Sequence, residues 1–394
     1  MKKQTQAIHL EYERRDAYDS LSVPVYNTLA YEFDNAAVMA EAFTDKIKAP
    51  DYSRVENPTV TNLERRVAAL TDAAHATAFN SGMAAISNTL MALAAQGKNI
   101  VTSKHLFGNT YALLVATLRR FGVKVRLRDL TNIEAVREAI DDDTCCVFLE
   151  ILTNPQLEVA DLKAISEVAH KKNVPLVVDS TVIPFTQFSA KSLGVDIEVV
   201  SSSKYVSGGA TSLGGLVIDY GTPYNGDFAK RLYGEMLFNF GAYMTPQVAY
   251  MQTIGLETLD ARYRVQSSNA LELAKKLRSL PQIKYVNYVG LEDNPYHELA
   301  QRQFGKTAGA MICIDLESKE ACFSFLNNLK LIHRATNLFD NRSLAIHPAS
   351  TIFGAFSESM RKSMDVKDTT IRLSVGLEDV DDLFEDIKQA VDSL

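Results

Sequence analysis

The sequence lacks the features that would mark a membrane, nucleic-acid-binding or secreted protein. It has no apolar run near the roughly 20 residues that a bilayer-spanning helix needs. The net charge of −7 is spread along the chain without a basic tract, which argues against nucleic acid and anionic membranes as partners. The first residues, Met1 to Thr5, lead into polar sequence and show no signal peptide. We therefore expect a soluble, cytoplasmic protein.

Cysteine is also scarce, with 4 residues among 394. Cys145 and Cys146 are adjacent in an apolar stretch that is typical of a buried strand. Cys313 and Cys322 lie far along the chain, and the spacing of the four does not match a metal site. We interpret them as structural thiols of a reducing compartment and expect no metal.

The length exceeds what one compact core usually holds, so two or three domains are expected.

The order of strand and helix patterns divides the chain into three parts. Residues 1–60 show weak periodicity and are predicted to form an N-terminal arm with a short helix near 36–43. In residues 61–245, short apolar strands alternate with helices, which predicts a mainly parallel sheet covered on both faces. Ligands of such sheets bind beyond the carboxyl ends of the strands. Residues 246–394 begin with a long helical stretch and are predicted to form a smaller C-terminal α/β domain.

Two residues of opposite charge follow strands of the predicted sheet. Lys204 lies in the run Ser201-Ser202-Ser203-Lys204-Tyr205, and Asp179 ends an apolar strand upstream. A lysine amine can form a Schiff base with the aldehyde of pyridoxal phosphate (PLP), and a carboxylate can keep the pyridine nitrogen protonated, so that the ring accepts electrons. The serine hydroxyls can bind the phosphate. For Lys204 taken alone, the alternative is an exposed loop lysine.

Four further features could complete such a site. Ser81-Gly82-Met83 opens a helix after a strand, where backbone N–H groups suit a phosphate, although the same pattern serves plain helix capping. Tyr111 can stack on a pyridine ring or can be a half-buried helix residue. Asn154 precedes a proline in a turn and can point its amide at the ring or at a substrate carboxylate. Arg372 lies in a strand whose alternation turns it away from the buried face. It can hold an α-carboxylate through two parallel bonds or can be a solvated strand residue.

Together these motifs resemble the Cys/Met-metabolism family of PLP enzymes, which includes cystathionine γ-synthase. The resemblance runs nearly end to end and rests on five ordered motifs. They are Tyr52-Ser53-Arg54-Val55-Glu56-Asn57-Pro58-Thr59, Ser81-Gly82-Met83-Ala84-Ala85, Val178-Asp179-Ser180-Thr181, Ser201-Ser202-Ser203-Lys204-Tyr205 and Arg372-Leu373-Ser374-Val375-Gly376-Leu377-Glu378.

The resemblance implies a fold, a cofactor and an assembly. The fold is that of PLP-dependent transferases of fold type I, which is like that of aspartate aminotransferase. Lys204 would hold PLP and shuttle protons, Asp179 would pair with the ring nitrogen, and Tyr111 would stack on the ring. The remaining cofactor-binding residues would be Ser81, Gly82, Met83, Asn154, Thr181, Ser201 and Ser203. The substrate would be received by Asn154, Ser343 and Arg372. Tyr52 and Arg54 would reach the phosphate of a neighbouring subunit, in a homodimer or homotetramer with shared active sites.

The subfamily is indicated by the segment 336–351, which looks most like O-acetylhomoserine sulfhydrylases. The chain departs from the family at Val200 and Gly209, where histidines are usual. Leu113 stands where methionine γ-lyases are expected to place a cysteine. The resemblance therefore predicts a γ-replacement on an O-acylated homoserine, with O-acetylhomoserine as the expected form. Sulfide or a thiol would be the second substrate, and homocysteine or methionine would be the product.

Three alternatives remain open at this stage. A γ- or β-lyase of the same fold would break methionine or cystathionine down to a keto acid and ammonia. A partner-activated protein would bind PLP with little activity of its own, and the residues at 200 and 209 leave room for it. An aminotransferase would convert PLP to its amine form.

Arg342, beside the predicted substrate serine, would place a positive charge near the far end of the substrate.

Overall fold

The computed structural model describes residues 1–10, 16–44 and 46–394. Within these residues, seven strands form a large sheet in the order β1-β7-β6-β5-β4-β2-β3. Neighbouring strands from β6 to β3 are parallel, whereas β7 runs antiparallel to both β6 and β1. The mostly parallel sheet predicted from the alternation of strands and helices is therefore confirmed. The strands are β1 (His75–Phe79), β2 (Asn99–Thr102), β3 (Lys124–Leu127), β4 (Thr144–Glu150), β5 (Leu176–Asp179), β6 (Ile197–Val200) and β7 (Gly215–Asp219).

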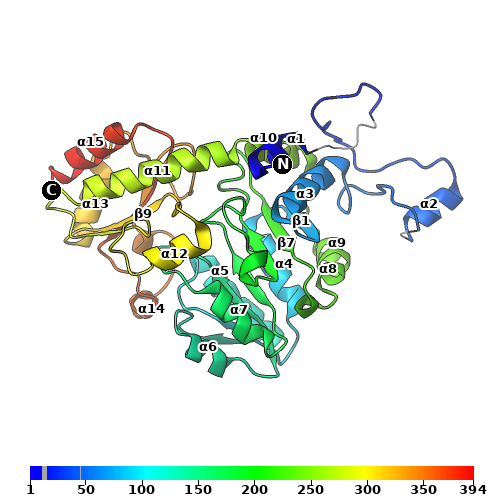
Figure 1. Ribbon diagram of the computed structural model, residues 1–394, viewed down its shortest axis with the longest axis horizontal. Coiled ribbons are helices and arrows are strands. Elements are labelled where there is room, and N and C mark those ends of the chain that lie inside the picture. Colours follow the sequence, from blue (N-terminus) through cyan, green and yellow to red (C-terminus); the bar gives the residue numbers. More distant parts are fainter. Residues whose placement is uncertain (11–15, 45) are drawn as a thin grey trace.

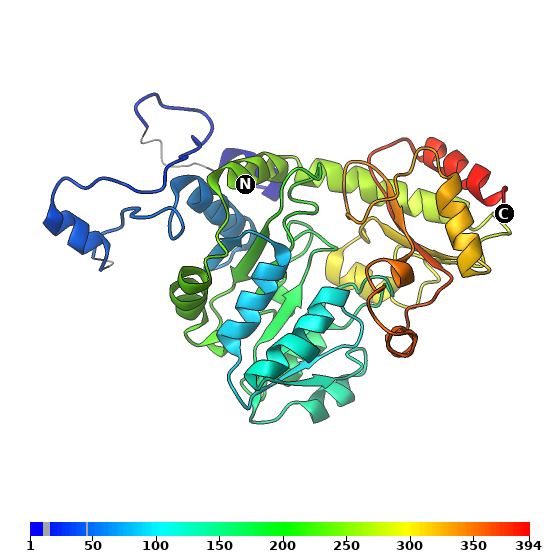
Figure 2. The ribbon, with the colours of Figure 1, turned by 180° about the vertical axis from the view of Figure 1, so that it is seen from behind.

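Helices cover both faces of the large sheet, as Figures 1 and 2 show from opposite sides. On one face lie α6 and α7, and on the other lie α4 and α5. Because both faces are covered, the central strands β2, β4 and β6 are buried almost throughout. The helices of the first 245 residues are α1 (Lys3–His9), α2 (Ala36–Ala42), α3 (Pro58–Thr71), α4 (Gly82–Leu93), α5 (Gly108–Ala112), α6 (Ile133–Ala139), α7 (Leu162–His170), α8 (Phe228–Arg231) and α9 (Phe238–Phe240).

A second, smaller sheet is antiparallel and belongs to the C-terminal part of the chain. Its order is β10-β11-β9-β8, with strands β8 (Tyr285–Asn287), β9 (Met311–Asp315), β10 (Leu344–Ile346) and β11 (Thr370–Ser374). This small domain lies at the end of the molecule opposite the arm (Figure 1). The helices after residue 245 are α10 (Pro246–Glu257), α11 (Leu259–Leu277), α12 (His297–Phe304), α13 (Lys319–Asn328), α14 (Glu358–Ser363) and α15 (Val380–Val391), of which α10 lies beside α1 and α3 (Figure 1). The predicted α/β fold with a smaller C-terminal domain is confirmed.

The N-terminal part differs from the uniform arm that the sequence predicts. Helix α1 was not expected, and it packs on the body of the protein: Gln4 donates to the carbonyl of Glu257 at the end of α10 (2.9 Å), and Lys3 donates to the carbonyl of Phe188 (3.0 Å). Further along, the chain leaves the body and carries the expected short helix α2, which projects from it in Figures 1 and 2. The domain boundaries at residues 60 and 245 remain predictions.

Candidate active site

Lys204 lies in a turn directly after β6, at the carboxyl edge of the large sheet. The side chain is half-buried, and its Nζ donates to the Asn337 amide oxygen at 2.8 Å. Burial, and secondarily the positive charge of Arg372, lower the pKa of Lys204 to about 8. An exposed loop lysine is therefore the wrong interpretation. The amine is neutral in a sizeable fraction of molecules near neutral pH, which is the form that acts as nucleophile or base.

Two carboxyl groups lie side by side at the ends of neighbouring strands. Asp179 ends β5 and is paired in register with Glu150 at the end of β4. Asp179 accepts a hydrogen bond from the Thr181 backbone N–H (2.9 Å), and in the described part of the chain it pairs with no lysine or arginine. Burial raises the pKa of Asp179. Burial, together with the charge of Asp179, raises the pKa of Glu150 to about 8. A bound cation beside Asp179 would relieve this arrangement, because it would stabilise the ionised carboxylate.

The start of α4 forms a close-fitting cradle with the turn after β6. Ser81 caps the helix by accepting from the Ala84 N–H (3.1 Å). A Cβ on Gly82 would lie 2.6 Å from Ser201 Cβ and 2.7 Å from its Oγ, so only glycine permits this approach. Thr181 Oγ1 accepts from the Ser201 N–H (2.8 Å), which ties the cradle to the strand that carries Asp179. The helix N-terminus and the Ser201 hydroxyl thus meet at one anion-compatible point.

Arg372 occupies the middle of the small sheet, and the prediction that it turns away from the buried face is wrong. All residues of β11 are buried, and Arg372 is 2% exposed. Its guanidinium donates to Asn154 Oδ1 and to the Asn337 carbonyl, both at 3.3 Å, and its Nε has no partner within the described residues. Burial lowers the pKa of Arg372 to about 10, which leaves it a cation. A buried cation with an unused donor is suited to bind a carboxylate.

Asn337, Asn154 and Arg372 therefore connect to Lys204 in one chain of contacts. Asn337 comes from the segment 336–351 of the small domain, and Asn154 comes from the loop after β4. The sequence motifs did not single out Asn337 or Glu150 as site residues. Glu150 could have been found from its register opposite Asp179, whereas no local pattern marks Asn337.

Other predicted site residues lie apart from this chain of contacts or already have partners. The Tyr111 ring packs edge to face on Phe356 of the small domain, with centroids 5.9 Å apart. The Ser203 hydroxyl donates to the Gly214 carbonyl (3.1 Å) and accepts from its N–H (2.9 Å). The Ser343 hydroxyl donates to Glu378 (2.8 Å). Met83 is half-buried next to Gly82 and packs against the helix-side core of the large sheet. Their roles in the site remain predictions.

Tyr52 and Arg54 belong to the base of the arm. They line a cavity of about 1070 Å³ between the arm and the body, and the Arg54 guanidinium lies over the Tyr52 ring at 5.4 Å. Arg54 also donates to the carbonyl of Phe238. Within the described residues, neither side chain contacts Lys204 or Asp179. At the departures from the family, Val200 is packed in the core and the Gly209 carbonyl accepts from Arg342 (3.1 Å).

Comparison with known proteins identifies the family. A family model described as "Cys/Met metabolism PLP-dependent enzyme" matches residues 4–392. The chain belongs to the Cys/Met-metabolism family of PLP-dependent enzymes. It is 37% identical to an L-methionine gamma-lyase of Fusobacterium nucleatum over 99% of this chain and 98% of that protein. It is 32% identical to the O-acetyl-L-homoserine sulfhydrylase of Corynebacterium glutamicum over 98% and 95%, respectively.

A solved structure from the same family shows the fold and the cofactor. A crystal structure from Campylobacter jejuni, described as that of an O-acetylhomoserine (thiol)-lyase, matches with a TM-score of 0.95, 35% identity and full coverage of both chains. That protein carries N'-pyridoxyl-lysine-5'-monophosphate. The predicted fold type I and the predicted PLP cofactor are thereby confirmed. Members named as lyases and as sulfhydrylases are comparably similar to this chain, so the comparison establishes a PLP-dependent enzyme of sulfur amino-acid metabolism.

The residues of this family member fit PLP. A half-buried carboxylate without a cationic partner suits a pyridinium N–H, and the cradle of Gly82 and Ser201 suits a phosphate. The half-buried Lys204 amine, with its lowered pKa, suits the aldehyde. Among the described residues, no cluster of histidine, cysteine or carboxylate side chains could hold a metal ion. None of the described helices has the length and apolar character that crossing a membrane requires.

Proposed function

We propose that the protein catalyses γ-replacement on an O-acylated homoserine, most simply O-acetylhomoserine, with sulfide or a thiol. The observation that carries the proposal is the 2.8 Å contact of Lys204 with Asn337. Asn337 belongs to the segment 336–351, whose sequence resembles O-acetylhomoserine sulfhydrylases. The contact therefore brings the subfamily-specific segment to the amine that would move protons. With sulfide, the net reaction converts O-acetylhomoserine and hydrogen sulfide to homocysteine and acetate.

Arg372 and Asn154 would bind and orient the substrate. The buried guanidinium would pair with the α-carboxylate through two parallel bonds, and the Asn154 amide would fix its plane. Because Arg372 is held by Asn154 and Asn337, the carboxylate would be placed close to Lys204. Arg342, whose side chain is more than half exposed and paired with Asp340, lies on the same segment and is a candidate for contacting the distal end of the substrate.

Lys204 and Asp179 would handle the protons. PLP, when bound, supplies the electron sink that stabilises negative charge at the α-carbon. Lys204 Nζ would take the proton from Cα and then one from Cβ, which allows the acyloxy group to leave Cγ, and it would return protons after sulfur has added at Cγ. Asp179 would hold the proton on the pyridine nitrogen throughout. The lowered pKa of Lys204 matches a base that works near neutral pH.

A γ-lyase is the second candidate, and the similarity to the Fusobacterium L-methionine gamma-lyase favours it. The two reactions share the steps up to departure of the γ-substituent and differ in whether a sulfur nucleophile or water completes the reaction. Purified enzyme loaded with PLP is to be incubated with O-acetylhomoserine plus sulfide and, separately, with methionine, and the products are identified by mass spectrometry. We expect homocysteine from the first mixture. Keto acid and ammonia from methionine, with no homocysteine, would replace the proposal by the lyase.

Asp179→Asn tests the role of the carboxylate in either reaction. We expect the variant to bind PLP and to lose about 10²- to 10⁴-fold in kcat, because an amide cannot keep the ring nitrogen protonated. Glu150→Gln is the matched control: the raised pKa of Glu150 makes its neutral form common, and glutamine imitates that form, so a much smaller loss is expected. Turnover by Asp179→Asn at the rate of the parent enzyme would refute the role.

A further inference from the structure

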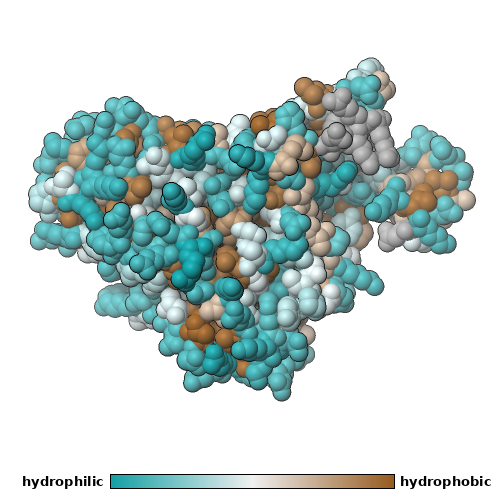
Figure 3. All heavy atoms as spheres, in the orientation of Figure 1, coloured by the Kyte–Doolittle hydropathy of each residue, from teal (hydrophilic) through white to brown (hydrophobic). Residues whose placement is uncertain are grey.

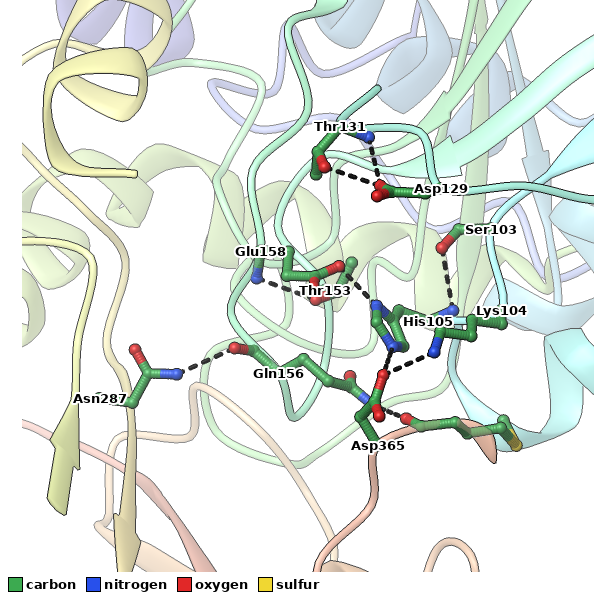
Figure 4. A network of polar contacts seen from close by, with 11 residues as sticks. Ser103, Lys104, His105, Asp129, Thr131, Thr153, Gln156, Glu158, Asn287 and Asp365 are labelled. Carbon is green, nitrogen blue, oxygen red and sulfur yellow. Dashed lines mark hydrogen bonds and ion pairs between the residues drawn. The ribbon is translucent and has the colours of Figure 1, made fainter. Parts of the chain in front are cut away.

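His105 is buried between carboxylates that belong to different domains. Its Nδ1 lies 2.5 Å from Glu158 of the large domain, and its Nε2 lies 2.8 Å from Asp365 of the small domain. Figure 4 shows the ring between the two carboxylates, with the Lys104 amine directed at Asp365. His105 itself is 6% exposed. His105, Glu158 and Asp365 form what we call the junction triad.

The chemistry of the junction triad requires a protonated imidazole. An ionised carboxylate can only accept hydrogen bonds, so both ring nitrogens must donate, and only the imidazolium carries two N–H groups. Burial by itself lowers the pKa of His105, but the hydrogen bonds and charges of Glu158 and Asp365 outweigh it and raise the pKa above its ordinary value. Charge-assisted bonds of this kind are stronger than neutral ones.

The junction triad connects the two segments that carry the proposed carboxylate clamp. Glu158 and Asn154 both lie in the loop after β4, and Asp365 lies in the connection from α14 to β11, the strand that carries Arg372. A second strap runs alongside: Gln156 Nε2 donates to the Met364 carbonyl (2.7 Å), and Asn287 on β8 donates to the Gln156 carbonyl (2.9 Å). Figure 4 shows this strap next to the triad. Loosening the triad would therefore change the distance between Asn154 and Arg372.

Other charged groups around His105 belong to every neighbouring segment. Lys104 pairs with Asp365 (2.7 Å), and Glu150 lines the same small cavity as His105. Tyr296 lies close enough to both Glu158 and Asp129 for electrostatic interaction, and Lys367 lies two residues after Asp365. Of these groups, only His105 contacts a carboxylate of each domain through its two ring nitrogens, and its raised pKa means that it loses its charge above the ordinary histidine value. The ion pair of Lys104 with Asp365 is partly exposed to solvent, so it contributes little.

We propose that His105 is a positioning residue that, as an imidazolium, clamps the small domain to the large domain and sets the distance between Asn154 and Arg372. This inference rests on the proposed function, in which those two residues hold the α-carboxylate of the substrate. Because the pKa of the folded protein is raised, the clamp is complete at and below the ordinary histidine value of 6.5 and is lost as the pH rises through the raised value. Affinity for the amino-acid substrate therefore falls on the alkaline side.

Kinetics of charge-removing variants test the inference. Glu158→Gln and Asp365→Asn keep the shape of the side chains but remove one carboxylate each, so the His105 pKa falls and the rise of KM moves to lower pH. His105→Ala raises KM for the amino-acid substrate at neutral pH by about 3- to 30-fold, leaves kcat within about twofold and removes the dependence of KM on the junction. His9→Ala, an exposed histidine on α1, is the matched control and follows the parent enzyme.

Hydrogen exchange of the holoenzyme supplies a readout that does not depend on the reaction. After correction for intrinsic exchange, we expect residues 364–369 to lose protection between pH 7 and pH 9.5 in the parent enzyme. In His105→Ala the protection is already low at pH 7. If no sulfur amino acid is turned over, the proposed function fails, and exchange still decides for or against the clamp. Exchange and KM profiles of the three variants that coincide with those of the parent enzyme overturn the inference. If His105→Ala does not fold, the two conservative variants decide alone.

Discussion

At the scale of the residue, the site depends on ionisable side chains whose pKa values are shifted by burial. Lys204 has a pKa of about 8, and the pKa values of Asp179 and Glu150 are shifted upwards because the two share a poorly solvated strand edge. Each shift fits a chemical role. A neutral amine can attack an aldehyde, and a carboxylate without a cationic partner can pair with a protonated pyridine nitrogen. Perturbed groups that converge at one point are typical of an active site.

The rate of PLP loading should report the Lys204 pKa. Since only the neutral amine attacks the aldehyde, loading of the apoenzyme is expected to speed up with pH and to level off above about 8. Arg372→Met removes a charge that lowers this pKa, so the levelling-off should move to higher pH. Arg342→Met removes an exposed guanidinium that is paired with Asp340 and should leave the profile in place. Absorbance of the cofactor, followed by stopped flow from pH 6 to pH 10, measures all three. A flat profile in the parent enzyme would contradict the assignment.

At the scale of the element, the site exists because several strands end at the same edge. β4 ends in Glu150, β5 ends in Asp179, and β6 leads into the turn with Lys204. Helix α4 begins at this edge as well, and its N-terminus approaches Ser201 so closely that no side chain fits at position 82. The parallel register brings these groups together without any of them being close in sequence.

Gly82→Ala tests the close approach of α4. The added methyl group must displace Ser201, so we expect a loss of about 1–3 kcal/mol in the free energy of unfolding and weaker binding of PLP. Gly234→Ala is the matched control, because a Cβ there meets no atom within 4 Å. Chemical denaturation and cofactor titration measure the two effects. Equal stability and equal PLP binding of the two alanine variants would show that the contact between Gly82 and Ser201 can accommodate a methyl group.

At the scale of the whole molecule, the projecting arm carries apolar side chains that the rest of the chain leaves uncovered. Leu29, Met39 and Phe43 on or near the projecting helix α2 are 62%, 46% and 58% exposed. Figure 3 shows apolar surface on this projecting part. Exposed apolar side chains gathered on one segment are typical of surfaces that bind a partner, and we propose that role for the arm. The family resemblance implies that the partner is a second copy, whose site would receive Tyr52 and Arg54.

Mixing two inactive variants tests whether active sites are shared. Arg54→Ala removes the arm's contribution, and Lys204→Ala removes the amine. If each site uses Arg54 of one chain and Lys204 of the other, random 1:1 dimers regain about a quarter of the parent activity, because half of the dimers carry one intact site. Activity is measured after co-refolding, with each variant alone as the control. Mixtures that stay as inactive as the separate variants would mean that each chain builds its own site.

The sequence by itself determined the large sheet, the order of its helices and the set of motifs. Strands β2, β5 and β7 are buried along nearly their whole length, and strands covered on both faces are recognisable in a sequence as short apolar segments between polar turns. The lysine, the strand-end carboxylate and the glycine at the helix start follow from local chemistry. Their order along the chain was sufficient for the family.

Only the tertiary structure decided which polar side chains are buried, and with whom. Strand periodicity predicts two faces for β11, but whether both are covered depends on what packs on the sheet, and the loop after β4 brings Asn154 against Arg372. The junction triad joins residues 105, 158 and 365, and no local pattern relates positions so far apart. Helix α1 is too short to be stable alone and exists through its contacts with the body. Burial and pKa are properties of the packed molecule, so they appear only once the chain has folded.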